Sequence, residues 1–500
     1  MTVHSMPLWL GKRAELTPDK LALIMDGQAL TFRVLSLQVH AMMDELQRLG
    51  VQKGSHIGSL LNHSVDSVVL IHALQGLGVV HILLNTRLSP KEWEFQLKDA
   101  DATLLIYADE FSPVVHQLEM ERLSLRELSE RSFHSKVTHP DHSQLHHREL
   151  VLSDVHSIMY TSGTTGKPKG VLLTHENHWW SAMSSAIHLG VDPKDVWLLC
   201  IPIYHVGGLS ILLRSVILGF TVVMMRRFEA NEVNEAIQEH RVTLISVVSV
   251  MLSKMLDSLE RDRYPDFLRC VLVGGGSVPR TLLDDCLARE VPVYQTYGLT
   301  ETASQIVTLD QEQIRHKIGS AGKALFPSQL KIIDENRACQ PHEIGEILLK
   351  GPTICSGYYR RAEENEKVFV DGWFSTGDLG YLDHEGYLFV VDRRSDLMIS
   401  GGENVYPSEI EAVLMSHPLI IDAGVTSMHD DTWGQVPVAY LHIQDHQVVT
   451  GLDLITYCAN HLAKYKVPVV FYKVKALPRN ASQKLVRREL QHLLEVEEIK

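Results

Sequence analysis

Residues 160–170 constrain this chain more than any other stretch, and they read Tyr-Thr-Ser-Gly-Thr-Thr-Gly-Lys-Pro-Lys-Gly. Apolar runs at residues 157–160 and 171–174 predict short strands on both sides of this loop. Glycines let backbone N–H groups approach an anion, and hydroxyl and ammonium groups can meet phosphate oxygens. The loop is not a Walker P-loop, because only two residues separate Gly163 from Gly166 and no Ser or Thr follows the first lysine. A flexible linker shares this composition but does not explain a position between apolar strands.

Length and composition predict a globular protein with more than one domain. The 500 residues exceed one ordinary core, and 45% hydrophobic with 22% charged residues is typical of soluble proteins. A net charge of −14 argues against nucleic acid or an anionic membrane as the main partner. We expect no signal peptide and no membrane span, since the longest apolar run, Val68–Leu84, reads as a buried helix followed by a strand. Six scattered cysteines without a CxxC pair favour reduced thiols and a cytoplasmic location.

The first 150 residues alternate between helical and strand patterns, which predicts a parallel or mixed sheet with helices on both faces. Helical spacing covers 35–49 and 66–77, and strand patterns cover 57–61, 79–84 and 103–106. Residues 131–147 break this alternation because they are polar and hold five histidines: His134, His139, His142, His146 and His147. Their spacing matches no zinc motif, so we predict a solvated loop.

Three later stretches carry residue types suited to a nucleotide. Residues 269–279 predict a buried strand that ends in three glycines, where a planar ring can lie against bare backbone; a tight strand-to-helix turn explains them equally well. In residues 295–304, Tyr297 can stack on a base, Thr300 can touch a phosphate and Glu301 can hold Mg²⁺. Asp378, in a Ser-Thr-Gly-Asp run, can accept hydrogen bonds from both ribose hydroxyls.

Taken together and in this order, these motifs resemble those of the adenylate-forming superfamily of acyl-CoA synthetases, adenylation domains and luciferases. The resemblance covers nearly the whole chain. It implies that ATP or AMP is bound by Thr161, Ser162, Gly163, Thr164, Thr165, Gly166, Lys167, Gly274, Gly275, Gly276, Tyr297, Gly298, Asp378 and Arg393. It also implies catalytic roles for Thr300, Glu301, which would hold Mg²⁺, and His205, which borders the acyl pocket and the route of the thiol; alone, His205 would more often be structural.

The resemblance extends to a hinge and a catalytic lysine. Ser395 lies at the pivot, where many relatives carry Asp or Lys, and this departure leaves the hinge itself intact because a hinge residue need only absorb dihedral change. Lys484 matches the catalytic lysine, although Ala-Ser-Gln precedes it where relatives carry Gly and Lys. Gly401 and Gly402 would line the tunnel for the pantetheine arm of CoA.

The resemblance implies an α/β fold of two domains and a reaction in two halves. Residues 1–392 would form a large domain of mixed sheets flanked by helices, and residues 393–500 a small mobile α+β lid. With ATP, Mg²⁺ and CoA, such an enzyme makes an acyl-adenylate and then a thioester. A homodimer or homotetramer is suggested by the same resemblance alone. The chain has no GxSxG or GxGxxG motif, so serine hydrolase and Rossmann dehydrogenase interpretations fall away.

The sequence indicates the identity of the carboxylic-acid substrate less directly than it indicates the reaction. Residues 84–89, 201–205 and 295–309 resemble most closely the o-succinylbenzoate–CoA ligases of menaquinone synthesis. Ser304 and Gln305 would line the acyl pocket with His205, and small polar residues suit an aromatic keto-acid with a second carboxylate. Residues 201–210 contain no aspartate, which argues against an amino-acid substrate.

Three alternatives stay open at this point. The chain could be a ligase for coumarate, benzoate or a medium-chain acid, or a free-standing adenylation module that loads a carrier protein. It could also be a nucleotide-binding relative without turnover. The joint presence of Glu301, Asp378, Arg393 and Lys484 argues against that loss.

Overall fold

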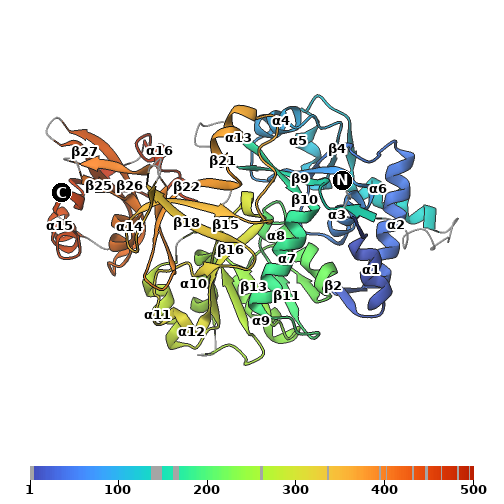
Figure 1. The fold of residues 1–500 in the computed structure, drawn as a ribbon, viewed down its shortest axis with the longest axis horizontal. Helices are drawn as coiled ribbons and strands as arrows, with labels where there is room; N and C mark the ends of the chain where they lie inside the picture. Colours follow the sequence, from blue (N-terminus) through green and yellow to red (C-terminus); the bar gives the residue numbers. More distant parts are fainter. Residues whose placement is uncertain are drawn as a thin grey trace.

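The computed structural model describes residues 5–136, 149–161, 168–259, 263–276, 278–334, 337–393, 396–400, 403–430, 433–444, 449–462, 464–480, 484–494 and 496–500. Figure 1 shows a molecule that is longer than it is wide, with the C-terminal elements gathered at one end and the N-terminal elements toward the other. The mixed α/β architecture predicted from the sequence is confirmed.

A six-stranded sheet carries the phosphate-binding loop predicted at residues 160–170. Its strands, in spatial order, are β10 (Lys169–Thr174), β9 (Val155–Thr161), β5 (Val80–Leu83), β4 (His56–Leu60), β6 (Leu104–Tyr107) and β7 (Arg122–Ser124). All neighbours are parallel except β9 and β10, which pair antiparallel on either side of the loop. The predicted strands at 57–61, 79–84 and 103–106 match β4, β5 and β6 to within one or two residues.

A nine-stranded sheet carries most of the other predicted motifs. Its strands, in spatial order, are β17 (Lys323–Ala324), β16 (Ser304–Leu309), β15 (Val293–Leu299), β14 (Cys270–Val273), β13 (Leu244–Val247), β11 (Val196–Leu199), β12 (Thr221–Met224), β2 (Leu21–Met25) and β3 (Gln28–Thr31). The strands from β2 to β15 are parallel, while β3, β16 and β17 are antiparallel additions at the two edges. A short separate pair joins β1 (Ser5–Pro7) to β8 (Glu149–Val151).

Helices cover these sheets and connect their parallel strands. The described helices of this part are α1 (Trp9–Leu16), α2 (Phe32–Arg48), α3 (Val65–Leu77), α4 (Pro90–Asp99), α5 (Ser112–Val115), α6 (Leu125–Lys136), α7 (His175–Leu189), α8 (Val206–Leu218), α9 (Ala230–Glu239), α10 (Ser249–Asp257), α11 (Arg280–Ala288), α12 (Gln311–Ile314) and α13 (Ala362–Val368). Strand–helix–strand alternation is the usual connection between parallel strands, because such strands need a crossover of about a dozen residues.

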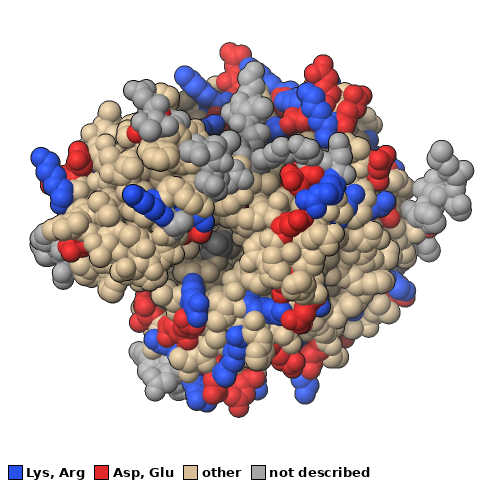
Figure 2. Space-filling view, turned by 60° about the vertical axis from the view of Figure 1, so that its left-hand side comes forward, with Lys and Arg blue, Asp and Glu red and all other residues tan. Residues whose placement is uncertain are grey.

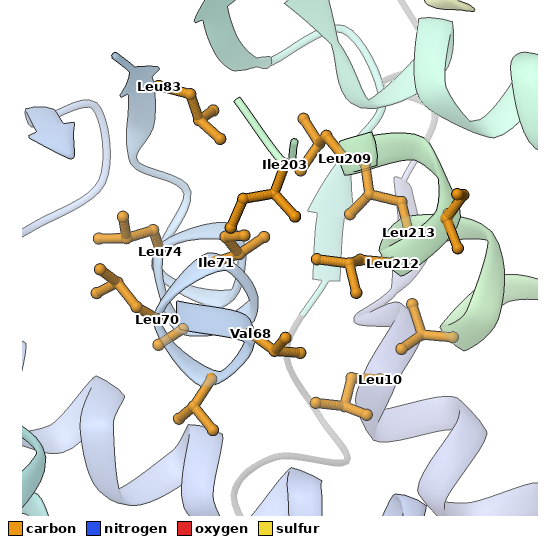
Figure 3. Close-up of a cluster of buried hydrophobic side chains, with 14 of the residues drawn as sticks. Leu10, Val68, Leu70, Ile71, Leu74, Leu83, Ile203, Leu209, Leu212 and Leu213 are labelled. Carbon is orange, nitrogen blue, oxygen red and sulfur yellow. The ribbon is translucent and has the colours of Figure 1, made fainter. Parts of the chain in front are cut away.

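The main hydrophobic core lies where α3 and α8 meet. Helix α3 is apolar on nearly all sides, as expected for a helix enclosed by protein, and Leu70, Ile71 and Leu74 are fully buried. Figure 3 shows Val68 and Ile71 on the side of α3 that faces Leu209 and its neighbours on α8, with Leu70 and Leu74 on the opposite side of α3. The Ser64 hydroxyl accepts a hydrogen bond from the N–H of Ser67 and caps the start of α3. This core fixes α8, whose first residue follows His205, against the rest of the domain.

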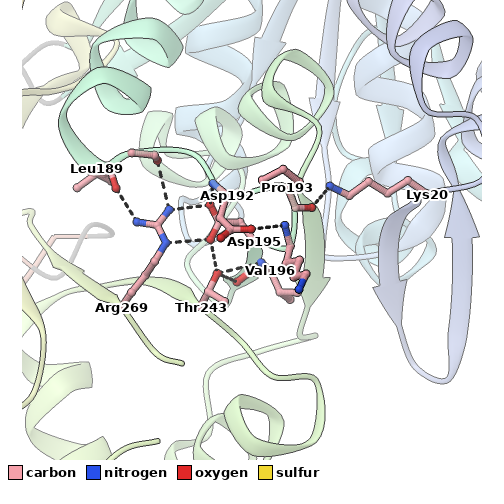
Figure 4. Close-up of polar contacts among 10 residues, drawn as sticks. Lys20, Leu189, Asp192, Pro193, Asp195, Val196, Thr243 and Arg269 are labelled. Carbon is pink, nitrogen blue, oxygen red and sulfur yellow. Dashed lines mark hydrogen bonds and ion pairs between the residues drawn. The ribbon is translucent and has the colours of Figure 1, made fainter. Parts of the chain in front are cut away.

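An ion pair ties together the amino ends of the parallel strands in the nine-stranded sheet. Arg269, just before β14, donates from Nε and Nη2 to the two oxygens of Asp195, at 2.9 and 2.6 Å. Asp195 precedes β11 and also accepts from the hydroxyl of Thr243, which precedes β13. Figure 4 shows this cluster, with Arg269 also donating to carbonyls at the end of α7. The opposite, carboxyl ends of the strands are therefore left for ligands, as is usual in open parallel sheets.

Two further sheets complete the fold. The first contains β19 (Arg337–Ala338), β18 (Gln329–Asp334), β20 (Gly345–Lys350), β22 (Trp373–Leu382), β21 (Phe369–Val370) and β23 (Leu388–Arg393). The second contains β25 (Glu403–Val405), β24 (Met398–Ser400), β27 (Gly434–Ile443), β28 (Val470–Lys473), β29 (Glu497–Glu498) and β26 (Ile420–Asp430), with helices α14 (Pro407–Met415), α15 (Gly451–Ala459) and α16 (Arg487–Leu490). The chain passes from the first of these sheets to the second between Arg393 and Met398.

The prediction for residues 131–147 is wrong in its first part. Residues 131–136 belong to α6, which begins at Leu125. Glu127 and Arg131, four residues apart, form an ion pair on this helix, and so do Arg126 and Glu130, so a polar run that lacks apolar periodicity is still helical. Residues 137–147, with four of the five histidines, lie outside the described residues. Among the described helices, none is long and apolar enough to cross a bilayer.

Candidate nucleotide and acyl site

The two strands that frame the predicted phosphate loop are tied down at their ends. Thr161, the last residue of β9, pairs with Lys169 of β10, and residues Ser162, Gly163, Thr164, Thr165, Gly166 and Lys167 lie outside the described residues. The Tyr160 hydroxyl donates to Asp99 at 2.8 Å, and Asp99 also forms an ion pair with Arg361 at 2.7 Å. On the other strand, Lys169 forms an ion pair with Glu364. Both loop ends are thus fixed by one segment, which contains Arg361 and Glu364.

The predicted nucleotide residues of the nine-stranded sheet lie at the carboxyl ends of adjacent strands. Gly274, Gly275 and Gly276 follow β14, and Tyr297 and Gly298 belong to the neighbouring β15. A Cβ at Gly298 would lie 2.0 Å from the carbonyl oxygen of Ser304, so only glycine fits between β15 and β16 here. A Cβ at Gly276 would meet nothing within 4 Å.

A tight turn after β15 holds Thr300 and Glu301. The turn forms a 3₁₀ helix over Thr300–Thr302, in which the Thr302 hydroxyl accepts from the N–H of Leu299 and donates to the carbonyl of Ser304 at 2.6 Å. Ser304 has a φ of +95°, a region that non-glycine residues rarely adopt. Such strained backbone persists only where surrounding contacts hold it, and here Thr302 supplies them.

Glu301 fits the requirements of a magnesium ligand. Its side chain is buried, and one carboxylate oxygen accepts a hydrogen bond from the Tyr358 hydroxyl at 2.9 Å. Burial and the negative charge of Glu301 raise the pKa of Tyr358, so the hydroxyl keeps its proton and remains a donor. Within the described part of the chain, no group of three or more His, Cys, Asp or Glu side chains could hold a metal ion. A lone carboxylate suits Mg²⁺, which is usually held by one or two carboxylates together with substrate phosphates.

The structure brings three predicted ribose and base residues together. Tyr297 donates a hydrogen bond from its hydroxyl to Asp378 Oδ2 at 2.8 Å. Asp378 is buried on β22, and its Cα is paired with that of Arg393 on β23. A base stacked on Tyr297 would therefore place its ribose near the carboxylate of Asp378.

Lys484, from the C-terminal region, and His205, at the start of α8, act on each other electrostatically. Burial lowers the pKa of His205 to about 4, with smaller contributions from the positive charges of Lys484 and Arg87. The Tyr204 ring packs edge-on against His205, with centroids 4.7 Å apart. The backbone N–H of Lys484 donates to the side chain of Asn480 at 2.9 Å. His205 is therefore neutral at neutral pH, and Lys484 is the cation of this pair.

The two predicted acyl-pocket residues on β16 differ in their surroundings. Ser304 is half-buried, whereas Gln305 is fully buried and its Oε1 accepts from Arg214 Nη1 at 3.2 Å. Arg214, on α8, also donates to the hydroxyl of Ser181 on α7 at 3.1 Å. Among the described residues, Arg214 is fully buried, and its hydrogen-bond partners are the neutral side chains of Gln305 and Ser181. Gln305 thus belongs to a network that places a buried positive charge behind β16.

The predicted hinge and tunnel residues, Ser395, Gly401 and Gly402, lie outside the described residues. The segment beside the hinge is held by Asp392, whose Oδ2 accepts from the N–H of Ser408 at 2.9 Å. Arg487 donates to Asp392 at 3.2 Å and to Asp396 at 2.6 Å. These contacts join the last strand before the hinge to the C-terminal sheet and helices.

Sequence reasoning missed the residues that support the site: Thr302, Tyr358, Lys169, Arg214 and Arg487. Lys169 and Thr302 lie within predicted motifs, and the partner of Lys169, Glu364, is 195 positions away. Tyr358 is 57 positions from Glu301. A buried arginine in an apolar helix was the one available signal for Arg214, because such a charge needs polar partners.

Figure 2 shows the face of the molecule seen when the C-terminal end is turned forward, with a deep hollow near its centre. Acidic and basic side chains both lie around the opening, so the net charge of −14 is not concentrated there.

The fold and these grouped motifs define an adenylate-forming enzyme, and comparison with known proteins agrees. The chain matches the AMP-binding enzyme family over residues 10–359 and the C-terminal domain of AMP-binding enzymes over residues 409–484. It belongs to the AMP-binding enzyme family, as the sequence motifs predicted.

Individual relatives are similar over the full length. The chain is 48% identical to the 2-succinylbenzoate–CoA ligase of Geobacillus sp. (strain WCH70), covering 98% of both chains. It is also similar to the o-succinylbenzoate CoA synthetase of Bacillus subtilis in complex with its acyl-adenylate intermediate, with a TM-score of 0.92, 44% identity and coverage of 99% and 100%. The same synthetase with ATP and a magnesium ion gives a TM-score of 0.91 at 44% identity, covering 98% and 100%.

Proposed function

We propose that this chain converts 2-succinylbenzoate and CoA to 2-succinylbenzoyl-CoA, with ATP consumed and AMP and pyrophosphate released, as a step of menaquinone synthesis. The observation that carries the proposal is that the positive charge of Lys484, from the C-terminal region, acts on His205 at the start of α8. A lysine in that position suits attack of a carboxylate on ATP, since both reactants are anionic. The full-length similarity to 2-succinylbenzoate–CoA ligases supports the choice of acid.

In the first half-reaction, the carboxylate of the acid attacks the α-phosphorus of ATP and pyrophosphate leaves, which gives the acyl-adenylate. Tyr297 and Asp378 would hold the base and ribose, Arg393 would contact ribose or phosphate, and the loop at 161–167 would surround the phosphates. Lys484 would neutralise charge on the attacking and leaving groups, and Thr300 would touch a phosphate. A magnesium ion on Glu301 would supply charge neutralisation between phosphate oxygens. Positioning and charge are the main contributions that a protein makes to this kind of transfer.

In the second half-reaction, the thiol of CoA attacks the carbonyl of the acyl-adenylate and AMP departs. By the family resemblance, Lys484 would have to leave the site before the thiol enters, so the C-terminal domain would turn about Ser395 first. Gly401 and Gly402 would then line the pantetheine tunnel. Closure of the site in both states keeps water from the mixed anhydride, which would otherwise hydrolyse. The proposal includes a domain boundary between residues 392 and 393.

The buried Arg214 supports an acid that carries a second anionic group. Its charge lies behind Gln305, and among the described residues its hydrogen-bond partners are neutral side chains. Buried cations are normally paired, so a substrate carboxylate near Gln305 would gain from this positive field. A plain fatty chain would gain nothing from it. The second carboxylate of 2-succinylbenzoate meets this requirement.

The first test is ATP–pyrophosphate exchange with 2-succinylbenzoate, benzoate, coumarate, octanoate and acetate, followed by CoA and mass detection of the thioester. We expect exchange and thioester with 2-succinylbenzoate alone. Exchange with a different acid would overturn the proposed substrate but would leave the proposed reaction type standing. Exchange without any thioester would indicate a module that loads a carrier protein. Binding of ATP without exchange for any acid would overturn the ligase proposal.

Location and assembly remain part of the proposal. The six cysteines are all unpaired, which fits the reducing cytoplasm. A homo-oligomer is suggested by the family resemblance, and light scattering after size-exclusion chromatography would measure it.

A further inference from the structure

One short segment, residues 355–365, runs between the phosphate-loop strands and the predicted magnesium ligand. Its backbone pairs with β10: the N–H of Leu172 donates to the carbonyl of Gly357 at 2.9 Å, and the N–H of Tyr359 donates to that of Gly170 at 2.8 Å. Val171 and Tyr358 form an isolated bridge between them. The segment is therefore fixed, through β10, to the strand that leaves the phosphate loop.

The same segment holds Glu301 at two points. The backbone N–H of Cys355 donates to the carbonyl of Glu301 at 2.7 Å. The hydroxyl of Tyr358 donates to Glu301 Oε1 at 2.9 Å, and the Tyr358 side chain is only 7% exposed. The ring of Tyr358 packs near Phe369, with centroids 6.2 Å apart, so its direction is set by packing as well. One oxygen of the Glu301 carboxylate is thus held in a fixed place.

A third contact links Tyr358 to the first residue of β10, Lys169. The ammonium group of Lys169, which follows the loop, lies 5.3 Å from the centre of the Tyr358 ring and forms an ion pair with Glu364 of the same segment. Lys169 is buried, where a cation over an aromatic face is worth more than at the surface. The Tyr358 side chain therefore contacts both Lys169, on the strand that leaves the phosphate loop, and the Glu301 carboxylate.

We propose that Tyr358 is a positioning residue for the magnesium–ATP complex, acting through Glu301. This proposal rests on the proposed role of Glu301 in binding Mg²⁺. Because Glu301 Oε1 accepts a hydrogen bond from the Tyr358 hydroxyl, the Glu301 side chain is held in one rotamer and one orientation relative to β10. Partners that orient a metal-binding carboxylate commonly change metal affinity or activity by about 10- to 100-fold when they are removed.

The adjacent tyrosine provides a matched control. The Tyr359 hydroxyl donates to Asp101 at 2.7 Å, and Asp101 also pairs with Arg360, on a more exposed part of the same segment. Tyr358→Phe and Tyr359→Phe each remove one hydroxyl and keep the ring. Only the first removes a contact with Glu301.

The experiment measures ATP binding by isothermal titration calorimetry, with saturating Mg²⁺ and with EDTA, in the absence of any acid. We expect Tyr358→Phe to weaken binding about 10-fold with Mg²⁺ and less than about twofold in EDTA, and Tyr359→Phe to match the wild type in both. An equal loss with and without Mg²⁺, or the same loss in Tyr359→Phe, would overturn the proposal. Because no acid is present, this result is independent of which acid the enzyme uses.

A double-mutant cycle separates positioning from a general structural effect. Glu301→Gln should abolish most of the magnesium-dependent gain in ATP affinity. In that background, Tyr358→Phe should cause no further loss, because the carboxylate that it orients is gone. A loss of the same size in both backgrounds would overturn the proposal, even if Tyr358→Phe also lowers the thermal stability. If Glu301→Gln leaves magnesium dependence unchanged, the proposed role of Glu301 fails as well.

Discussion

Gly298 and Gly276 differ in the space around them, so substitutions at the two positions can distinguish an effect on packing from an effect on ATP binding. A methyl group at Gly298 would overlap the backbone of Ser304, whereas one at Gly276 would meet no protein atom within 4 Å. We expect Gly298→Ala to lower the free energy of unfolding by about 1–3 kcal/mol, the usual cost of overpacking. Gly276→Ala should leave unfolding unchanged and weaken ATP binding about 10-fold, if the adenine lies against that backbone. Urea unfolding and calorimetry measure both; unchanged ATP affinity in Gly276→Ala would contradict the ring placement.

Lys484 gives the sharpest single-residue prediction. Lys484→Ala should slow adenylation by about 10²- to 10³-fold, the scale for losing one preorganised charge donor. Thioester formation from supplied acyl-adenylate should keep its rate, because Lys484 must leave the site for that step. Separate single-turnover assays of the two half-reactions check this. An equal loss in both would contradict a rotating C-terminal domain, and Lys473→Ala, at the end of β28, serves as a control for removing a lysine.

At the scale of elements, local patterns predicted what depends on local sequence. The buried helix and strand expected between Val68 and Leu84 are α3 and β5, because an apolar run broken by Gly78 specifies a helix end and a new strand. The end of α6 was wrongly predicted as loop. The role of residues 355–365 could not be predicted, since their pairing with β10 joins residues nearly 190 positions apart, and no periodicity encodes such a partner.

The contacts around Asp392 should bias the orientation of the C-terminal domain. Asp392 precedes the hinge and accepts hydrogen bonds from Ser408 and Arg487, which follow it. Turning about Ser395 would break these contacts but keep those of Arg487 with Asp396 and Glu411. We therefore expect Asp392→Asn to slow adenylation by about 10-fold and to leave thioester formation unchanged or faster, because losing a buried charged contact costs about 1.5–3 kcal/mol.

The two half-reactions of Asp392→Asn would be compared by single-turnover kinetics. Asp422→Asn is the matched control, since Asp422 pairs with Arg479 inside the C-terminal region and should not respond to rotation. A slower thioester step with normal adenylation would mean that these contacts stabilise the other orientation.

At the scale of the whole molecule, the glycines after β14 and the residues at the end of β15 could be placed from the sequence, because the carboxyl ends of adjacent parallel strands meet at one edge of the sheet. The long-range support was not specified: Arg214 behind Gln305 and Tyr358 beside Glu301 come from elements that only the tertiary fold brings together. The predicted adenylate-forming fold and reaction class are confirmed, and the roles of individual site residues stay predictions.

A cluster of buried histidines inside the N-terminal region makes the molecule sensitive to acid. The members come from α3, β5, β9 and α7 and are His72, His81, His156, His175 and His178. The ring centroids of His156 and His178 are 4.7 Å apart. Burial lowers the pKa of His72 and His175 to about 4 and of His81 and His178 to about 3, and burial together with the neighbouring histidines lowers that of His156 well below its ordinary value.

The unfolded chain takes up protons at these histidines near pH 6.5, whereas the folded chain does not until about pH 4 or below. Their contribution is therefore fully present above pH 6.5 and is lost as the pH falls through this window. At pH 5 each of the four histidines with a folded pKa of about 3 or 4 lowers the free energy of unfolding by about 2 kcal/mol, and the four together by about 8 kcal/mol, comparable to the whole stability of a domain. We expect the N-terminal region to unfold near pH 5, seen as loss of circular dichroism and urea resistance. His178→Phe should reduce the proton uptake on unfolding between pH 7.5 and 5 by about one. If the slope of the free energy of unfolding against pH is unchanged in His178→Phe, this ring is charged in the folded protein. The cluster would then need a compensating anion.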